Sequence, residues 1–211
     1  MKKKITIIDY GLGNILSAQQ SFLKSIKDNS INAEVVITNK PKDIINATHI
    51  VLPGQGAFKS CMNGLLKIPE MIEQLSYSVH NNKIPFLGIC VGMQLLANNS
   101  YENGDHKGLG WIEGEILKLP QNNLKLPHMG WNEVKILNNK NKLISDNKEN
   151  DYYFVHSYHF HCKHQENIAG ITNYGIDFTS FICRENIYGV QFHPEKSSTQ
   201  GLNLIKNFLS L

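Results

Sequence analysis

The segment from Ile84 to Ile89 is a continuous apolar run, without the polar alternation of a strand that has one wet face. A strand of this kind is buried on both faces, which is typical of a parallel sheet with helices on both sides. In the chain before it, short β-rich runs alternate with helical patterns, as in βαβ units. The expected strands are Ile5–Asp9, Val35–Thr38 and His49–Leu52, and the expected helices are Asn14–Ile26 and Pro69–His80, the second with proline at its start.

The second half of the chain changes character, because strand-like runs follow one another without long helical patterns between them. The expected strands are Trp111–Leu119, Glu133–Leu137, Tyr152–Phe160, Ile168–Thr172, Phe178–Cys183 and Ile187–Phe192, and a helix over Gly201–Leu211 closes the chain. We therefore predict an α/β fold with a mixed, mostly parallel sheet flanked by helices and extended by antiparallel strands. The polar stretch Asn138–Asn150 is interpreted as a surface turn region, so residues 1–211 are expected to form a single domain.

Composition excludes several classes of function. The 211 residues carry a formal net charge of only +3, and the basic residues are scattered, so nucleic acid is not an expected partner. No apolar stretch approaches the roughly 20 residues that span a bilayer, and we expect no membrane association and a cytoplasmic location. The four cysteines, Cys61, Cys90, Cys162 and Cys183, lack CxxC spacing, which argues against disulfides and structural zinc.

Cys90 lies at the end of the apolar run, inside Gly88-Ile89-Cys90-Val91-Gly92. This is the G-x-nucleophile-x-G spacing of a strand-to-helix elbow, in which the glycines make room for a strained turn. A helix that starts near Val91 would point its N-terminus at the sulfur and stabilise the thiolate. An isolated cysteine after an apolar strand is usually only a small buried residue, but the flanking glycines favour a nucleophile.

A thiolate nucleophile needs a base to move its proton, and the base needs an orienting acceptor. His193 follows an apolar strand, and Glu195 can accept a hydrogen bond from its imidazole while Pro194 stiffens the connection. Acyl transfer also needs donors for the oxyanion, and the glycine-rich turn Pro53–Gly56 follows the strand His49–Leu52. A turn of this composition is a weak signal by itself, and its position after a core strand makes it a candidate.

A second cluster has the composition of a metal site: His156, His159, His161 and His164, with Cys162 among them. In a strand, His159 and His161 would share one face and His156 the other, so the imidazoles would not converge. We therefore predict no metal here. His156 is assigned to a substrate pocket and the other histidines to exposed strand positions.

Taken together, the motifs resemble those of class I glutamine amidotransferases, and more narrowly those of the glutaminase subunits of imidazole glycerol phosphate synthase. The matching segments are Ile8–Asn14, Leu52–Phe58, Gly88–Leu96, His106–Gly110, Pro127–Asn132, Tyr153–Tyr158 and Val190–Ser198. The resemblance therefore runs nearly from end to end. Three positions depart mildly from the family pattern. Gln55 stands where the family often has valine, Val91 where leucine is frequent, and Ser157 where threonine is common.

The resemblance implies a role for each matching position. Cys90 would be the nucleophile, His193 the base and acid, and Glu195 its orienting partner. Backbone N–H groups of Gln55 and Val91 would form the oxyanion hole. Glutamine would be bound by Gly56, Gln94, His156, Ser157 and Tyr158. A partner subunit would face Asn14, Trp131, Tyr153 and Lys196. By themselves, the two aromatic residues could equally be core residues, and Lys196 a solvated charge.

The implied activity is hydrolysis of glutamine to glutamate and ammonia, without a cofactor. The ammonia would pass to a separate (β/α)₈-barrel synthase subunit of about 250 residues, which makes imidazole glycerol phosphate and AICAR in histidine biosynthesis. An alternative is a paralogous glutaminase that supplies ammonia for sugar amidation in surface-polysaccharide synthesis. A non-catalytic regulatory module is the third possibility, and the intact Cys90, His193 and Glu195 argue against it.

Overall fold

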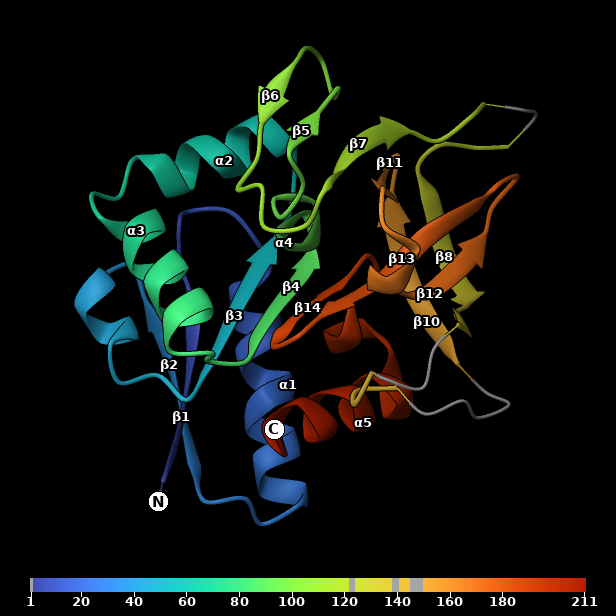
Figure 1. Cartoon of the computed structure of the whole chain (residues 1–211). Helices are drawn as coiled ribbons and strands as arrows, with labels where there is room; N and C mark the ends of the chain where they lie inside the picture. Colours follow the sequence, from blue (N-terminus) through green and yellow to red (C-terminus); the bar gives the residue numbers. More distant parts are fainter. Residues whose placement is uncertain (1, 122–123, 138–140, 145–149) are drawn as a thin grey trace.

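The computed structural model describes residues 2–121, 124–137, 141–144 and 150–211 (Figure 1). Within the predicted surface turn Asn138–Asn150, residues 138–140 and 145–149 lie outside the described residues. The buried hydrophobic side chains of the described chain form one cluster that extends through both halves of the sequence. The single domain expected over residues 1–211 stays a prediction.

Four strands from the first half of the chain and one from near its C-terminus build the parallel part of the sheet, in the order β2-β1-β3-β4-β14. These strands are β1 (Lys3–Ile8), β2 (Ala33–Thr38), β3 (His49–Gly54), β4 (Phe86–Cys90) and β14 (Ile187–Val190). Figure 1 shows α1 (Ile15–Asp28) and α5 (Ser198–Leu209) together on one side of these strands, and α2 (Phe58–Leu66) and α3 (Met71–Ser76) on the other. The carboxyl ends of parallel strands meet at one edge, so the residues that follow β3, β4 and β14 are neighbours.

Beyond β14 the sheet continues with strands that pair antiparallel with their neighbours, apart from one parallel pair near the far edge. They are β5 (Asn99–Ser100), β6 (His106–Lys107), β7 (Gly114–Lys118), β9 (Lys135–Ile136), β11 (Tyr158–Cys162), β12 (Ile168–Asn173) and β13 (Asp177–Arg184). A separate antiparallel pair is formed by β8 (His128–Glu133) and β10 (Asp151–His156). The predicted mixed α/β sheet with flanking helices and antiparallel additions is confirmed, and the additions are more extensive than predicted.

Short helical turns complete the fold: η1 (Pro41–Ile44), the π-helical turn η2 (Tyr77–Asn81), α4 (Val91–Gln94), η3 (Gln165–Asn167) and η4 (Pro194–Lys196). The helix predicted over Pro69–His80 begins at Met71 and continues into η2. The helix α2 was not predicted, because Ser60, Asn63 and Gly64 weaken its helical pattern.

The expected strand Tyr152–Phe160 is wrong as a single element, because the chain changes sheets at Ser157. Up to His156 it pairs with β8, and from Tyr158 it pairs with β7. The imidazole Nδ1 of His156 donates to the carbonyl oxygen of Tyr158 at 2.9 Å and closes this bend. The bend turns the segment toward the carboxyl edge of the parallel strands, where the candidate site lies.

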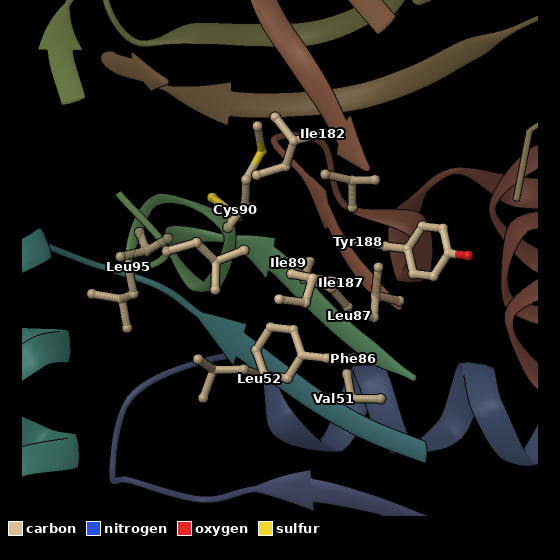
Figure 2. Close-up of a cluster of buried hydrophobic side chains, with 14 of the residues drawn as sticks. Val51, Leu52, Phe86, Leu87, Ile89, Cys90, Leu95, Ile182, Ile187 and Tyr188 are labelled. Carbon is tan, nitrogen blue, oxygen red and sulfur yellow. The ribbon is translucent and has the colours of Figure 1, made fainter. Parts of the chain in front are cut away.

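Figure 2 shows Cys90 at the end of β4, above the core side chains Leu87 and Ile89 of the same strand. The strand is buried at every position from Phe86 to Cys90, as predicted for a run with no polar alternation. The nucleophile candidate is therefore held at the end of a fully buried core strand.

Candidate active site

The backbone at Cys90 has φ 55° and ψ −113°, a left-handed conformation that is strained for a residue with a side chain. The turn is possible because glycine flanks it. A Cβ atom on Gly92 would lie 1.8 Å from the carbonyl oxygen of Leu52, and one on Gly88 would lie 2.6 Å from the carbonyl oxygen of Gly92. The elbow predicted from the sequence is present, and β3 packs against it where only glycine fits.

His193 follows β14 and precedes the turn η4, which carries Glu195. The ring Nδ1 of His193 lies 2.8 Å from Oε1 of Glu195, and both side chains are almost fully buried. The carboxylate can only accept, so Nδ1 donates the hydrogen bond and Nε2 remains without a partner among the described residues. Burial lowers the pKa of His193, but the nearby Cys90 sulfur and the hydrogen-bonded carboxylate of Glu195 favour the charged imidazolium and outweigh burial, so the net pKa is raised.

The glycine-rich turn lies beside the elbow, because Gly54 pairs with Cys90 in the β3–β4 register. The hydroxyl of Tyr10 donates to the carbonyl oxygen of Pro53 at 2.7 Å and holds the start of the turn. Gly56 has φ 97°, a conformation that favours glycine.

A cavity of about 260 Å³ lies at this edge of the sheet. Its lining includes nearly all the residues predicted to act on or bind a substrate: Gln55, Gly56, Cys90, Val91, Gln94, His156, Ser157, Tyr158 and His193. Glu195 stands behind His193, away from the cavity wall. Glu102 and Pro127 also line the cavity and were not predicted.

Two of the predicted binding side chains are already hydrogen-bonded to the protein. Gln94 donates through Nε2 to the carbonyl oxygen of Tyr158 at 2.9 Å and to Oε1 of Gln191 at 3.0 Å. His156 uses Nδ1 for Tyr158 and Nε2 for Nδ1 of His128, the second at 2.9 Å. Both ring nitrogens of His156 are therefore engaged, and its contribution to the cavity is apolar surface and backbone.

His128 and His156 form a buried pair whose tautomers follow from the partners. The carbonyl of Tyr158 can only accept, so Nδ1 of His156 carries its proton and Nε2 accepts from Nδ1 of His128. Nε2 of His128 in turn accepts from the amide of Asn132 at 3.2 Å. Burial lowers the pKa of His128 to about 4 and that of His156 to about 3, so both rings are neutral.

Three of the side chains assigned to a partner interface, Trp131, Tyr153 and Lys196, lie together beside the cavity. Trp131 is 55% exposed and meets Tyr153 edge to face across the β8–β10 pair, with ring centroids 6.3 Å apart. The ammonium of Lys196 lies 5.9 Å from the centre of the Tyr153 ring, and Lys196 also lines the cavity. Asn14 precedes α1, whose first turn packs near η4. Met129, which was not predicted, is 62% exposed on β8 beside Trp131.

The other histidines of the second cluster do not meet. His161 is exposed, and His164 contacts Glu113 at 2.7 Å. His159 is buried against Phe178, so its assignment to an exposed position is wrong. The reason is local: β11 lies inside the sheet beside β13, and Phe178 of β13 covers the ring of His159. Within the described ranges, no group of three or more His, Cys, Asp or Glu side chains has an arrangement that could hold a metal ion.

Gln191 was missed although it lies two residues before His193. It is fully buried, and its Nε2 lies 3.7 Å from the sulfur of Cys90. The available signal was a polar residue inside the otherwise apolar run Ile187–Phe192, but its partners are almost 100 residues away along the chain.

Comparison with known proteins gives a consistent family. The family model described as glutamine amidotransferase class-I matches residues 7–211. The imidazole glycerol phosphate synthase subunit HisH of Agrobacterium fabrum is 43% identical over 212 residues, covering 98% of each chain. The subunit of the same name from Pelagibacter ubique is 44% identical, covering 98% of this chain and 99% of the relative. The subunit HisH 2 of Methanococcus maripaludis is 46% identical, covering 97% of this chain and 98% of the relative.

Solved structures agree on the fold at low sequence identity. A glutamine amidotransferase crystal structure superposes with a TM-score of 0.69 at 14% identity, covering 97% of each chain. A glutamine amidotransferase from Thermotoga maritima gives a TM-score of 0.65 at 15% identity, covering 95% of this chain and 79% of that one. None of the helices in the described part of the chain is long and apolar enough to cross a bilayer.

Proposed function

The chain belongs to the class I glutamine amidotransferase family, and from this premise we propose that it is the glutaminase subunit of an imidazole glycerol phosphate synthase. It hydrolyses glutamine to glutamate and ammonia, and a synthase subunit uses the ammonia to make imidazole glycerol phosphate and AICAR in histidine biosynthesis. The observation that carries the chemistry is one cavity lined by the strained Cys90 and the Glu195-oriented His193.

In the proposed mechanism, Cys90, His193 and Glu195 act as a triad. The thiolate of Cys90 attacks the side-chain amide carbon of glutamine, the C–N bond breaks, and ammonia leaves with a proton from His193. His193 then takes a proton from water, which attacks the thioester, releases glutamate and regenerates the thiol. Glu195 accepts from Nδ1 throughout and keeps Nε2 directed at the reacting groups.

The remaining lining residues bind the substrate. We assign the oxyanion hole to the backbone N–H groups of Gln55 and Val91. The substrate's α-amino and α-carboxylate groups contact Gly56, Gln94 and the segment His156-Ser157-Tyr158. Since Nε2 of Gln94 is already used, its Oε1 is the atom that faces the substrate. None of these steps needs a cofactor.

The partner is a (β/α)₈-barrel synthase subunit, and the assembly is a heterodimer in the cytoplasm. The proposed contact surface combines Asn14, Trp131, Tyr153 and Lys196, because an exposed tryptophan that packs on a half-buried tyrosine next to a catalytic cavity is typical of an interface anchor. Ammonia formed at Cys90 then has a short path to the partner, since Lys196 belongs both to this surface and to the cavity wall.

Cysteine replacement tests the proposed activity. Cys90→Ser should abolish glutamine hydrolysis, because the hydroxyl is a far weaker nucleophile in this site. Simultaneous replacement of Cys61, Cys162 and Cys183 by Ala or Ser should leave most of the activity, since burial raises the pKa of each of these thiols and suppresses the reactive thiolate. Both proteins should be assayed with the partner subunit present and checked for folding by circular dichroism. A folded triple variant as inactive as Cys90→Ser would contradict the assignment.

A further inference from the structure

Gln191 is the first residue after β14, and its side chain is fully buried beneath the elbow. Its Nε2 donates to the sulfur of Cys90 across 3.7 Å, and this sulfur is its acceptor among the described residues. Its backbone N–H donates to the carbonyl oxygen of Ser180 at 2.9 Å, which anchors the residue to β13. The amide donor is therefore held against the reacting atom by the sheet itself.

The orientation of this carboxamide follows from its other neighbour. Oε1 of Gln191 accepts from Nε2 of Gln94 at 3.0 Å, and the same Nε2 donates to the carbonyl oxygen of Tyr158 at 2.9 Å. If the carboxamide of Gln191 were flipped, its NH₂ group would face the NH₂ group of Gln94, and its oxygen would face the electron-rich sulfur. Only the orientation that directs N–H at Cys90 satisfies both contacts.

The Tyr158 carbonyl extends this network, since it also accepts from Nδ1 of His156. His156 is fixed in turn by His128, and His128 by Asn132 on β8. Hydrogen bonds thus run without a break from the strand that carries Trp131 to the sulfur of Cys90. Every donor in the series has a determined direction, so the position of the Gln191 amide is set by groups on several strands.

We propose that Gln191 is a further catalytic residue, which donates a hydrogen bond to the Cys90 thiolate and stabilises it. A neutral thiol is a weak hydrogen-bond acceptor, so a buried amide directed at it would be almost unsatisfied. A thiolate is a charged acceptor, and a hydrogen bond to it is strong enough to offset the cost of removing the amide from water. Gln191 and the His193 imidazolium then act on the same sulfur, one through a hydrogen bond and the other through charge. The inference deepens the proposed glutaminase function and rests on it for its role in turnover.

The test measures the reactivity of Cys90 itself. Iodoacetamide is reacted with the full-length protein between pH 5 and 9, and the labelled Cys90 peptide is quantified by mass spectrometry. Gln191→Met keeps the length of the side chain and removes the donor. We expect the pH at which alkylation is half-maximal to rise, and the alkylation rate below that pH to fall by about tenfold or more. With the partner present, kcat should fall by a similar factor while KM changes much less.

Gln74→Met is the matched control: it removes the amide of Gln74 on α3, which donates to Ser78 on η2, and it should leave the Cys90 profile unchanged. A folded Gln191→Met protein with the wild-type alkylation profile would overturn the proposal. If that variant does not fold, NMR of the wild-type protein decides: the Gln191 side-chain amide signals should move with the same pH midpoint as Cys90 alkylation and should shift when Cys90 is alkylated. Signals that respond to neither would overturn it. Alkylation does not depend on glutamine turnover. An unchanged alkylation profile in Gln191→Met would therefore overturn the role of Gln191, whereas an active Cys90→Ser variant would overturn the proposed activity, and the two results can be told apart.

Discussion

The strained turn at Cys90 is formed by residues next to it in the sequence. The polar groups that surround its sulfur come from residues far along the chain. The elbow, His193 and Glu195 could be predicted from short motifs, because each motif places its groups within a few residues of one another. Gln191 and His128 could not, since their partners Gln94, on α4, and His156, on β10, come from other elements and other parts of the chain. Sequence spacing carries local geometry, whereas hydrogen bonds between strands depend on the register of the sheet.

The first prediction at the residue scale separates base from orienter. His193→Ala should lower kcat by at least about 10²-fold, since it removes the group that moves protons in both half-reactions. Glu195→Gln should cost less, because the amide oxygen can still accept from Nδ1 of His193. Steady-state kinetics at saturating glutamine with the partner present provides the measurement. An unchanged kcat in His193→Ala would require a different base.

A second prediction concerns the neutral pair His128 and His156. Their folded-state pKa values of about 4 and about 3 lie below the roughly 6.5 of an unfolded histidine. Below about pH 6.5 these two histidines take up protons in the unfolded chain, whereas in the folded protein their rings stay neutral. Their contribution to the free energy of unfolding is therefore complete above that pH and is lost as the pH falls toward 4. At pH 5 the loss should be roughly 1–2 kcal/mol for each ring.

Urea unfolding at pH 7 and pH 5 measures this loss. His128→Gln can still donate to His156 and accept from Asn132, but it does not titrate, so its stability should fall less between the two pH values. His161→Gln, a change at an exposed histidine, serves as the control and should keep the wild-type dependence. Equal slopes for His128→Gln and wild type would show that His128 is not held neutral.

At the scale of elements, the parallel half was predicted nearly strand by strand, because continuous apolar runs and βαβ alternation are strong signals. The antiparallel half was less predictable. The division of Tyr152–Phe160 into β10 and β11 depends on which strand each part pairs with, and no local pattern encodes that choice. In α2 the helical spacing of Phe58, Cys61, Met62 and Leu65 was present, but weak helix formers lie between them.

The contact between β3 and the elbow gives a prediction at this scale. Gly92→Ala would place a methyl group 1.8 Å from the carbonyl oxygen of Leu52, and the main-chain atoms of the core strand β3 and of the buried turn α4 cannot move aside cheaply. We expect the free energy of unfolding to fall by about 3 kcal/mol or more. Gly11→Ala is the control: its φ of 83° is strained but nothing lies within 4 Å of the added atom, so it should cost only about 1–2 kcal/mol. Equal losses in urea unfolding would contradict the packing explanation.

At the scale of the whole molecule, the proposed partner surface and the catalytic groups share the same elements. Tyr153 presents its ring to the surface, while its carbonyl oxygen accepts from the backbone N–H of His193 at 2.9 Å. The strand β8 begins at the buried His128 and carries Trp131 on its exposed side. A partner that binds one arrangement of β8 and β10 more tightly than another therefore shifts the cavity toward that arrangement.

Such coupling matters because the proposed subunit would waste glutamine if it hydrolysed it freely. We expect docking to move the Pro53–Gly56 turn into an arrangement whose N–H groups address the oxyanion. One well-aligned oxyanion donor is worth on the order of 10²–10³ in rate, so full stimulation should be at least that large. Lys196→Ala should weaken stimulation, since Lys196 joins the proposed surface to the cavity wall, whereas Lys206→Ala on α5 should not.

The most direct test of a glutaminase that works for a synthase partner is the rate of glutamine hydrolysis in three states. The rate is measured for this chain alone, for the chain with the cognate barrel subunit, and for that complex with the barrel's nucleotide substrate bound. We expect slow glutamine turnover by the isolated chain and a rate at least about 10²-fold higher in the loaded complex. An isolated chain as fast as the loaded complex would contradict it and indicate a free-standing glutaminase.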